Sequence, residues 1–180
     1  METKKEHWNI VYTTKRPDEV SWTQETPKTS LDFIHSYGLP KTANIIDVGG
    51  GDSKLVDYLL DEGYENITVL DISDKALERA KARLGKKSEK VKWVVSEVTE
   101  FQPGTTYDVW HDRATFHFLT TTEQISKYLS IARNAVRGYL TIGTFSENGP
   151  KKCSGLEIKQ YTETQLQGQL AEGFSKIRCI

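Results

Sequence analysis

Three glycines flanked by carboxylates form the part of this sequence with the clearest chemical meaning. Residues 45–48 form a short apolar run that contains one acid, Asp47, and the residues that follow are Gly49, Gly50, Gly51, Asp52 and Ser53. A further acid, Asp71, ends a second apolar run twenty residues after Gly51. Glycines after a buried strand let the backbone approach a ligand closely, and a carboxylate at the tip of the next strand can accept hydrogen bonds from a ribose. The spacing therefore predicts a nucleotide pocket.

The charges around the glycines indicate which nucleotide compound the pocket holds. Dinucleotide enzymes have a third glycine where this chain has Lys54, and they seat a pyrophosphate at the following helix N-terminus. Here Asp47 and Asp52 flank the loop, and two carboxylates repel phosphate and favour a cation. S-adenosyl-L-methionine (SAM) carries a sulfonium and an ammonium but no phosphate. The pattern therefore favours SAM over NAD and disfavours a nicotinamide oxidoreductase.

Several segments resemble the class I SAM-dependent methyltransferases. Besides the glycine loop, these are residues 69–73 and 107–118. More narrowly, the chain is similar to a largely uncharacterised group with His-Trp, Ser-Trp and Cys-Ser-Gly-Leu segments, here at residues 7–8, 21–22 and 153–156. Distant similarity, mostly in the glycine loop, extends to lysine methyltransferases of citrate synthase and elongation factors. The resemblance implies an α/β fold, a Rossmann-like three-layer αβα sandwich with a mostly parallel sheet, and an enzyme that uses SAM.

The resemblance also assigns roles around the cofactor. Asp47 is expected near the ammonium, and Asp71 is expected to accept hydrogen bonds from both ribose hydroxyls. Glu97 and Val98 match the positions that recognise adenine, and Ile72 is expected to pack on the adenine face. A solvated strand-end acid is the alternative for Glu97, and a helix-entry acid is the alternative for Asp71. The predicted cofactor-binding residues are Asp47, Gly49, Gly50, Gly51, Ser53, Asp71, Ile72, Glu97, Val98, His111 and Trp22.

A polar cluster follows the fourth expected strand, where substrates bind in open α/β sheets. His111 or His117, neutral near pH 7, could act as a general base that removes a proton from the methyl acceptor. The alternative is structural, with His111 and Arg113 holding the loop under the cofactor. The two histidines and Asp112 could be read as metal ligands, but no further ligand accompanies them. We expect no metal site.

Two sequence features missing from this region narrow the range of methyl acceptors. Amino-methylating DNA and RNA enzymes carry an Asn- or Asp-Pro-Pro-aromatic segment after this strand, but residues 111–114 are His-Asp-Arg-Ala. Cytosine C5 chemistry needs a cysteine nucleophile, and residues 44–152 contain none. We therefore predict methyl transfer by in-line displacement to an N, O or S atom of a small molecule or protein side chain. A non-catalytic SAM-binding sensor or scaffold is the alternative.

Composition describes an ordinary globular chain. The 180 residues are 37% apolar and 27% charged, with a formal net charge of −1. This predicts one domain over residues 1–180 that is not drawn to nucleic acid by its overall charge. No apolar stretch is long enough to span a bilayer, and the N-terminus lacks the apolar core of a signal peptide. We expect a cytoplasmic protein without a membrane partner, as a monomer or weak dimer.

Alternating patterns predict the elements that position these residues. Residues 1–30 are expected to form an N-terminal arm or lid containing Trp8, Tyr12 and Trp22, with packing onto the core as the alternative. The last hairpin of the class is expected to be missing or truncated. Strands are predicted at about 44–49, 66–71, 90–95, 107–112 and 138–145. Helices are predicted at about 30–37, from 52 or 53 to 63, from 73 to 85, from about 121, and at about 162–171.

Overall fold

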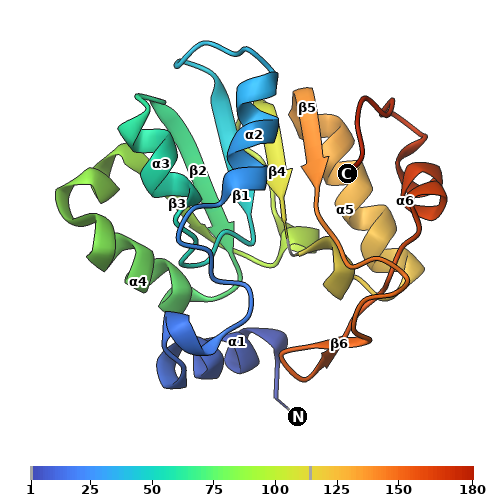
Figure 1. The fold of residues 1–180 in the computed structure, drawn as a ribbon, viewed down its shortest axis with the longest axis horizontal. Coiled ribbons are helices and arrows are strands. Elements are labelled where there is room, and N and C mark those ends of the chain that lie inside the picture. The colour runs from blue at the N-terminus through green and yellow to red at the C-terminus, as the bar shows by residue number, and fades with distance from the viewer. Residues whose placement is uncertain (1, 114) are drawn as a thin grey trace.

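The computed structural model describes residues 2–113 and 115–180, and it places a parallel sheet between two layers of helices (Figure 1). The sheet has the order β3-β2-β1-β4-β5, and all neighbouring pairs are parallel. Its strands are β1 (Asn44–Val48), β2 (Asn66–Asp71), β3 (Val91–Val95), β4 (Tyr107–Asp112) and β5 (Val136–Ile142). The α-helices are α1 (Lys4–Thr14), α2 (Lys28–Ser36), α3 (Leu55–Asp61), α4 (Asp74–Leu84), α5 (Thr122–Ala135) and α6 (Glu163–Leu170). Short 3-10 helices cover Pro17–Glu19, Gly85–Lys90, Val98–Glu100 and Phe116–Phe118.

Apolar side chains on both faces of the strands explain the three layers. Along β1, Ile45 packs with the helices α2, α3 and α4, whereas Ile46 and Val48 pack with α5. Successive side chains of a strand point to opposite faces, so a strand covered on both sides reads as a continuous apolar run. The predicted αβα sandwich is confirmed.

The helices α4 and α5 begin where the sequence predicted, because each has a capping residue. Ser73 caps α4 by accepting a hydrogen bond from the Ala76 N–H at 3.1 Å, and Gly85 ends the helix with a φ of 56°. Thr121 and Gln124 form the expected capping box at the start of α5. Strand β5 begins at Val136, two residues before the predicted start.

The start of α3 differs from the prediction. Asp52 and Ser53 were expected to begin this helix, but it begins at Leu55 with Lys54 at the N-cap position. The Ser53 N–H donates to the Gly50 carbonyl at 2.8 Å, so Ser53 belongs to the turn that closes the glycine loop. The Asp52 carboxylate lies 3.4 Å from the Arg79 guanidinium, which holds it against α4. Both residues are thus part of the loop.

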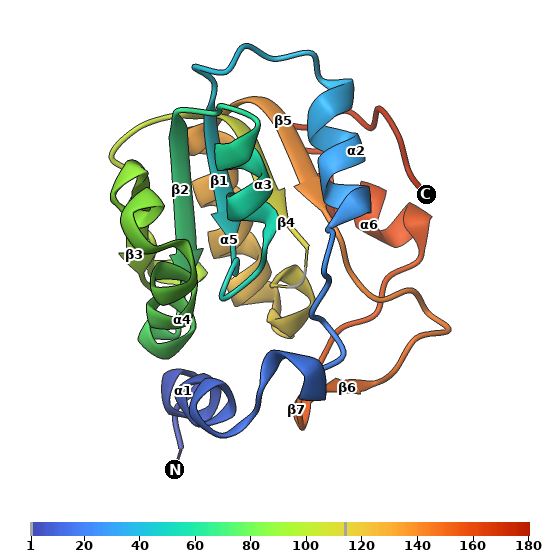
Figure 2. The same cartoon turned by 60° about the vertical axis from the view of Figure 1, so that its left-hand side comes forward.

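Two segments lie beyond the carboxyl ends of the strands (Figures 1 and 2). One is α1, which the apolar pattern did not reveal because only Val11 and Tyr12 of its residues are buried. The other is the hairpin of β6 (Lys152–Cys153) and β7 (Leu156–Glu157), which the chain enters after β5. In residues 2–113 and 115–180, β5 is the last strand of the large sheet. The helices of this part of the chain are all too short or too polar to cross a membrane.

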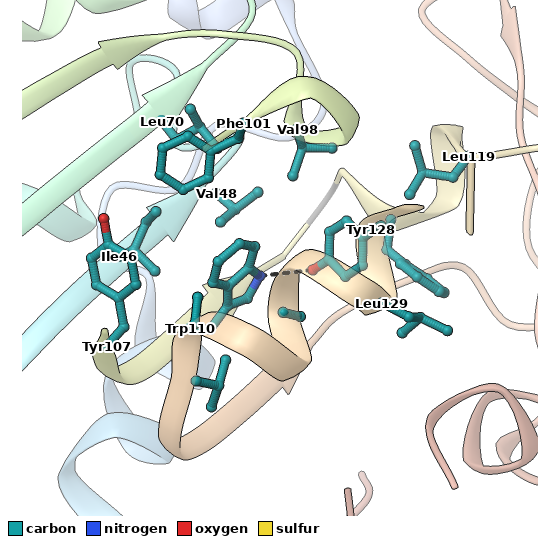
Figure 3. Packing of buried hydrophobic residues seen from close by; sticks show 14 of the residues in the cluster. Ile46, Val48, Leu70, Val98, Phe101, Tyr107, Trp110, Leu119, Tyr128 and Leu129 are labelled. Atoms are coloured by element: carbon teal, nitrogen blue, oxygen red, sulfur yellow. Dashed lines mark hydrogen bonds between the residues drawn. The ribbon is translucent and has the colours of Figure 1, made fainter. Parts of the chain in front are cut away.

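A buried hydrogen-bonded chain connects the core to the turn after β4. The Trp110 indole N–H donates to the Tyr128 hydroxyl at 2.9 Å (Figure 3), and that hydroxyl donates to the Asp112 carboxylate at 2.8 Å. The same carboxylate accepts the backbone N–H groups of Thr115 and Phe116 at 2.8 and 3.2 Å. Burial raises the pKa of Asp112 to about 6, although these hydrogen bonds lower it. The core therefore fixes the backbone of the turn.

Removing the Tyr128 hydroxyl is expected to destabilise the protein. In a Tyr128→Phe variant the buried indole of Trp110 and one Asp112 oxygen lose their partner, which should cost roughly 1–3 kcal/mol in the free energy of unfolding. Tyr58→Phe is the matched control, because the Tyr58 hydroxyl meets Thr26 at the surface, and less than about 0.5 kcal/mol is expected there. Urea denaturation followed by circular dichroism measures both; equal losses would contradict a structural role for the Tyr128 chain.

Candidate functional site

A cavity opens at the carboxyl ends of the central strands. The space within it, including the open mouth, is about 1060 Å³. The walls come from the ends of β1, β2 and β4, the segment after β3, the helix α1, and Cys153 of the β6–β7 hairpin. Parallel strands end at one edge of a sheet, so residues far apart in sequence meet here.

The glycine loop forms the floor of the cavity and tolerates no side chains. The N–H groups of Gly49 and Gly50 donate to the Leu70 carbonyl at 2.7 and 3.2 Å, which fastens the loop to the end of β2. Gly49 has a φ of 66°, and a Cβ there would overlap the hydroxyl of Thr115. A Cβ on Gly51, with a φ of 52°, would lie 2.5 Å from the Tyr12 hydroxyl. The loop backbone therefore stays bare toward the cavity.

Asp71 is a buried carboxylate at the end of β2. Its side chain is 7% exposed, and it accepts the Ser73 N–H at 2.8 Å. Burial raises its pKa to about 7; the Ser73 and Gly51 N–H groups oppose this, while the nearby Asp47 and Asp52 carboxylates add to it. No cation of the described residues forms an ion pair with Asp71. The carboxylate is thus ready to accept hydrogen bonds from a ligand that favours its ionised form.

Ligand affinity is therefore expected to depend on pH through Asp71. A ligand that donates hydrogen bonds to the carboxylate lowers its pKa, so binding must release a proton wherever the free group is protonated. With the pKa of the free group at about 7, we expect affinity for S-adenosylhomocysteine to rise about tenfold from pH 6 to pH 8. Calorimetry in two buffers of different ionisation enthalpy should show the proton release near pH 6.5. A flat profile in wild type would contradict the pKa of Asp71, and Asp71→Asn should remove the pH dependence.

A second buried carboxylate, Asp47, is held by a histidine. β1 and β4 pair in a register that sets Asp47 beside His111, and the Asp47 carboxylate lies 2.8 Å from His111 Nδ1. The other ring nitrogen, Nε2, lies 2.9 Å from the hydroxyl of Ser30 on α2. His111 is only 3% exposed, and both of its nitrogens are occupied. This geometry orients Asp47 and engages both ring nitrogens of His111.

The structure does not bring His117 to the cavity. Its side chain is 2% exposed, packs between Phe118 and Phe145, and is not part of the cavity wall. Burial lowers its pKa to about 4, and neither ring nitrogen has a hydrogen-bond partner in the described part of the chain. His117 therefore lies outside the cavity that its predicted role as a general base requires, whereas His111 lines the cavity and its role as a base stays a prediction.

Aromatic side chains from the N-terminal arm form part of the cavity wall. Trp8 packs edge-to-face against Trp22 and Phe118, with ring centroids 5.8 and 5.3 Å apart. Arg113, at the end of β4, donates to the Trp22 carbonyl at 2.7 Å and so ties the arm to the sheet. At the other end of the cavity, Lys4 Nζ lies 3.8 Å from the Glu97 carboxylate. The arm thus supplies part of the site.

Nearly all of the predicted cofactor-binding residues meet at this cavity. Asp47, Gly49, Gly50, Ser53, Asp71, Ile72, Glu97, Val98, His111 and Trp22 line it. Gly51 is not part of the lining but bonds through its N–H to Asp71. The lining residues absent from the predicted set include Lys4, Trp8, Tyr12, Arg113, Thr115 and Cys153. Position directly after a strand could have revealed Arg113, whereas the contribution of Lys4 depends on how α1 docks.

The chain is similar in sequence to known methyltransferases. A family model described as "Methyltransferase domain" matches residues 45–138. The eEF1A lysine and N-terminal methyltransferase of Mus musculus is 29% identical over 94 residues, which cover 52% of this chain and 13% of that protein. The malonyl-[acyl-carrier protein] O-methyltransferase of Anoxybacillus flavithermus is 32% identical over 105 residues, which cover 57% of this chain and 39% of that protein. The chain therefore spans less than half the length of these two relatives.

Solved structures share the fold. The 1,6-didemethyltoxoflavin-N1-methyltransferase of Burkholderia thailandensis, with S-adenosylhomocysteine bound, has a TM-score of 0.69 at 20% identity and covers 94% of this chain and 72% of its own. The N-methyltransferase NodS of Bradyrhizobium japonicum, also with S-adenosylhomocysteine, has a TM-score of 0.69 at 16% identity and covers 86% of this chain and 79% of its own. At these identities the likeness concerns the fold.

Proposed function

The chain belongs to the methyltransferase-domain family, a family of SAM-dependent enzymes, and on that premise we propose that its cavity binds SAM and passes the methyl group to an N, O or S atom of a small molecule or protein side chain. The observation that carries the proposal is the pair of buried carboxylates, Asp47 and Asp71, beside three glycines at which a side chain would clash or strain the backbone. Such a site suits a cationic ligand with hydroxyl donors and no phosphate.

The hydrogen-bonding and charged groups of the cavity fit SAM. Asp71 offers carboxylate oxygens for two hydroxyls, and burial raises its pKa to about 7. Asp47, oriented by His111, faces the loop where an ammonium group would be neutralised. Glu97 and Val98, beside the end of β3, provide a polar and an apolar contact for a base. We assign Asp71 to the ribose, Asp47 to the ammonium, and Glu97, Val98 and Ile72 to the adenine.

The protein itself contributes the alignment of the methyl acceptor with the methyl group. Bound SAM supplies a methyl group already activated on a sulfonium, so holding the acceptor in line with it can contribute several kcal/mol, up to roughly 7–11. The Asp112 network holds the turn after β4 that bounds the acceptor end. We propose that residues 1–30 act as the cover of the cavity, because Trp8, Tyr12 and Trp22 line it and would exclude water around a bound ligand.

The names of the relatives indicate two kinds of methyl acceptor. The named activity of the mouse relative is methylation of a protein lysine and N-terminus, and that of the bacterial relative is O-methylation of a malonyl group on a carrier protein. Nitrogen and oxygen acceptors are therefore both within the proposal. Both need only a nucleophile with an available lone pair at the mouth of the cavity.

Two measurements test this function. Calorimetry against SAM, S-adenosylhomocysteine and NADH should give binding of the first two only; NADH binding without SAM binding would remove the proposal. Radiolabelled SAM incubated with metabolite pools and protein extracts should then give a labelled product. Binding without any transfer would favour a cofactor sensor over an enzyme.

A further inference from the structure

The wall of the cavity offers few groups that could take a proton from a methyl acceptor. His111 has both nitrogens occupied, by Asp47 and by Ser30. Asp52 pairs with the guanidinium of Arg79 at 3.4 Å. Each of these groups already bonds to another side chain, so none is left open as a base for a second ligand.

The other titratable groups of the wall lie at the adenosine end or hold their own proton. Asp71 and Glu97 are at the ends of β2 and β3, where the proposed function places ribose and adenine. Burial raises the pKa of the Cys153 thiol and of the Tyr12 phenol above their ordinary values, so both stay protonated near pH 7. Within the described wall, each group that could act as a base is therefore bonded to another side chain, assigned to the cofactor, or protonated.

Arg113 is a cavity cation without a carboxylate partner. Among residues 2–113 and 115–180 no acid forms an ion pair with it, whereas Lys4, the other Lys or Arg of the described lining, pairs with Glu97. The only hydrogen bond of its guanidinium within these residues goes to the Trp22 carbonyl. A guanidinium has five N–H donors in a planar fork that matches a carboxylate, so donors remain for a ligand.

The position of Arg113 separates it from the adenosine end. In the strand order β3-β2-β1-β4-β5, the glycine loop follows β1, with Glu97 beyond β3 on one side and Arg113 after β4 on the other. Near Arg113 the wall is formed by Trp8, Trp22 and Phe118, whose rings offer flat apolar surface. Among the described residues, this end of the cavity combines one unpaired positive charge with an apolar wall.

Resting on the proposed function, we infer that the methyl acceptor is a small carboxylate with an apolar, planar body, held through its anionic group by Arg113 and through its body by Trp8, Trp22 and Phe118. A carboxylate is ionised near pH 7 and needs no base. One carboxylate oxygen bonds to the methyl carbon as the methyl–sulfur bond breaks, and the electron pair of that bond stays on sulfur. The sulfonium and the carboxylate become a neutral thioether and a neutral methyl ester, and no proton moves.

Equilibrium binding tests this assignment without turnover. Phenylacetate and its neutral isostere phenylacetamide are titrated by ligand-observed NMR into the protein saturated with S-adenosylhomocysteine. Wild type is expected to bind the acid at least about tenfold more tightly than the amide. Arg113→Gln should remove that preference while leaving amide binding unchanged, and Arg113→Lys should keep part of it. Arg133→Gln, in α5 and paired with Glu172 away from the cavity lining, should keep all of it.

The outcomes separate this inference from the proposed function. Equal binding of acid and amide in wild type, no binding of phenylacetate at millimolar concentration, or a preference that survives in Arg113→Gln would each overturn the carboxylate acceptor while SAM binding stands. Failure of wild type to bind S-adenosylhomocysteine would overturn both. As a second readout, tritiated SAM and a set of aromatic acids should give label that alkali releases as volatile methanol, the signature of a methyl ester; alkali-stable product alone would contradict it.

Discussion

Replacing Asp71 with alanine is expected to weaken binding of S-adenosylhomocysteine by about 100-fold or more. The assigned role gives Asp71 two charge-assisted hydrogen bonds to ribose hydroxyls, each contributing roughly 1.5–3 kcal/mol. Other residues lining the described cavity cannot replace them, since Asp47 is held by His111 and Asp52 by Arg79. Calorimetry measures the affinity directly.

Measuring the thermal stability of Asp71→Ala distinguishes a loss of affinity from unfolding of the variant. Because burial raises the pKa of Asp71 to about 7, the ionised group opposes folding at pH 8, and the stability it contributes is present below its unfolded pKa and lost as pH rises through 7. Asp71→Ala should therefore melt within a few degrees of wild type at pH 8. Asp61→Ala, a surface acid at the end of α3, should keep both affinity and stability. Unchanged affinity in Asp71→Ala would mean that the ribose assignment is mistaken.

Gly49→Ala is expected to abolish cofactor binding and to destabilise the protein. The residue has a φ of 66°, and its new Cβ would overlap the Thr115 hydroxyl, which itself bonds to the Val48 carbonyl at 3.3 Å. The backbone strain costs about 1 kcal/mol, and displacement of the turn after β4 adds roughly 1–3 kcal/mol. Urea denaturation gives the stability, and calorimetry gives the affinity.

Gly38→Ala provides a matched control for the glycine prediction. Gly38 has nearly the same backbone conformation, with a φ of 62°, but a Cβ there would meet nothing within 4 Å. This variant should lose only the strain energy, about 1 kcal/mol, and should keep full affinity. Equal losses in the two variants would show that the conformation of Gly49, rather than its packing against Thr115, is what matters.

The elements that carry short-range signals could be predicted from the sequence. Strands β2 and β4 have the predicted bounds, and the caps Ser73 and Thr121 fix the helices that follow, because capping depends on residues within one turn. The helix α1 was missed although Thr3 and Glu6 form a capping box, since its buried face is too small to give an apolar period. The helix α3 starts later than predicted because Ser53 lies in the turn that closes the glycine loop, where its N–H bonds to the Gly50 carbonyl.

The two histidines show the limit of reasoning from residue types. A histidine after a strand is typical both of a base and of a structural tie, and the sequence left both open. The register of β1 against β4 and the docking of Ser30 occupy both nitrogens of His111, while the packing of Phe118 and Phe145 keeps His117 away from the cavity. Arg113 was weighed only as a structural tie, and its lack of an acidic partner appears only when the surrounding carboxylates are placed.

By itself, the sequence determined the family of folds, the loop and the carboxylate positions of the candidate site, because glycines, strand ends and the acid at 71 lie within one βαβ unit whose geometry is local. Only the tertiary structure decided which side chains are free to meet the acceptor. That choice depends on which groups bond or pair with one another across β1, β4, α2 and the N-terminal arm, and such partners are set by packing between segments that sequence spacing does not encode.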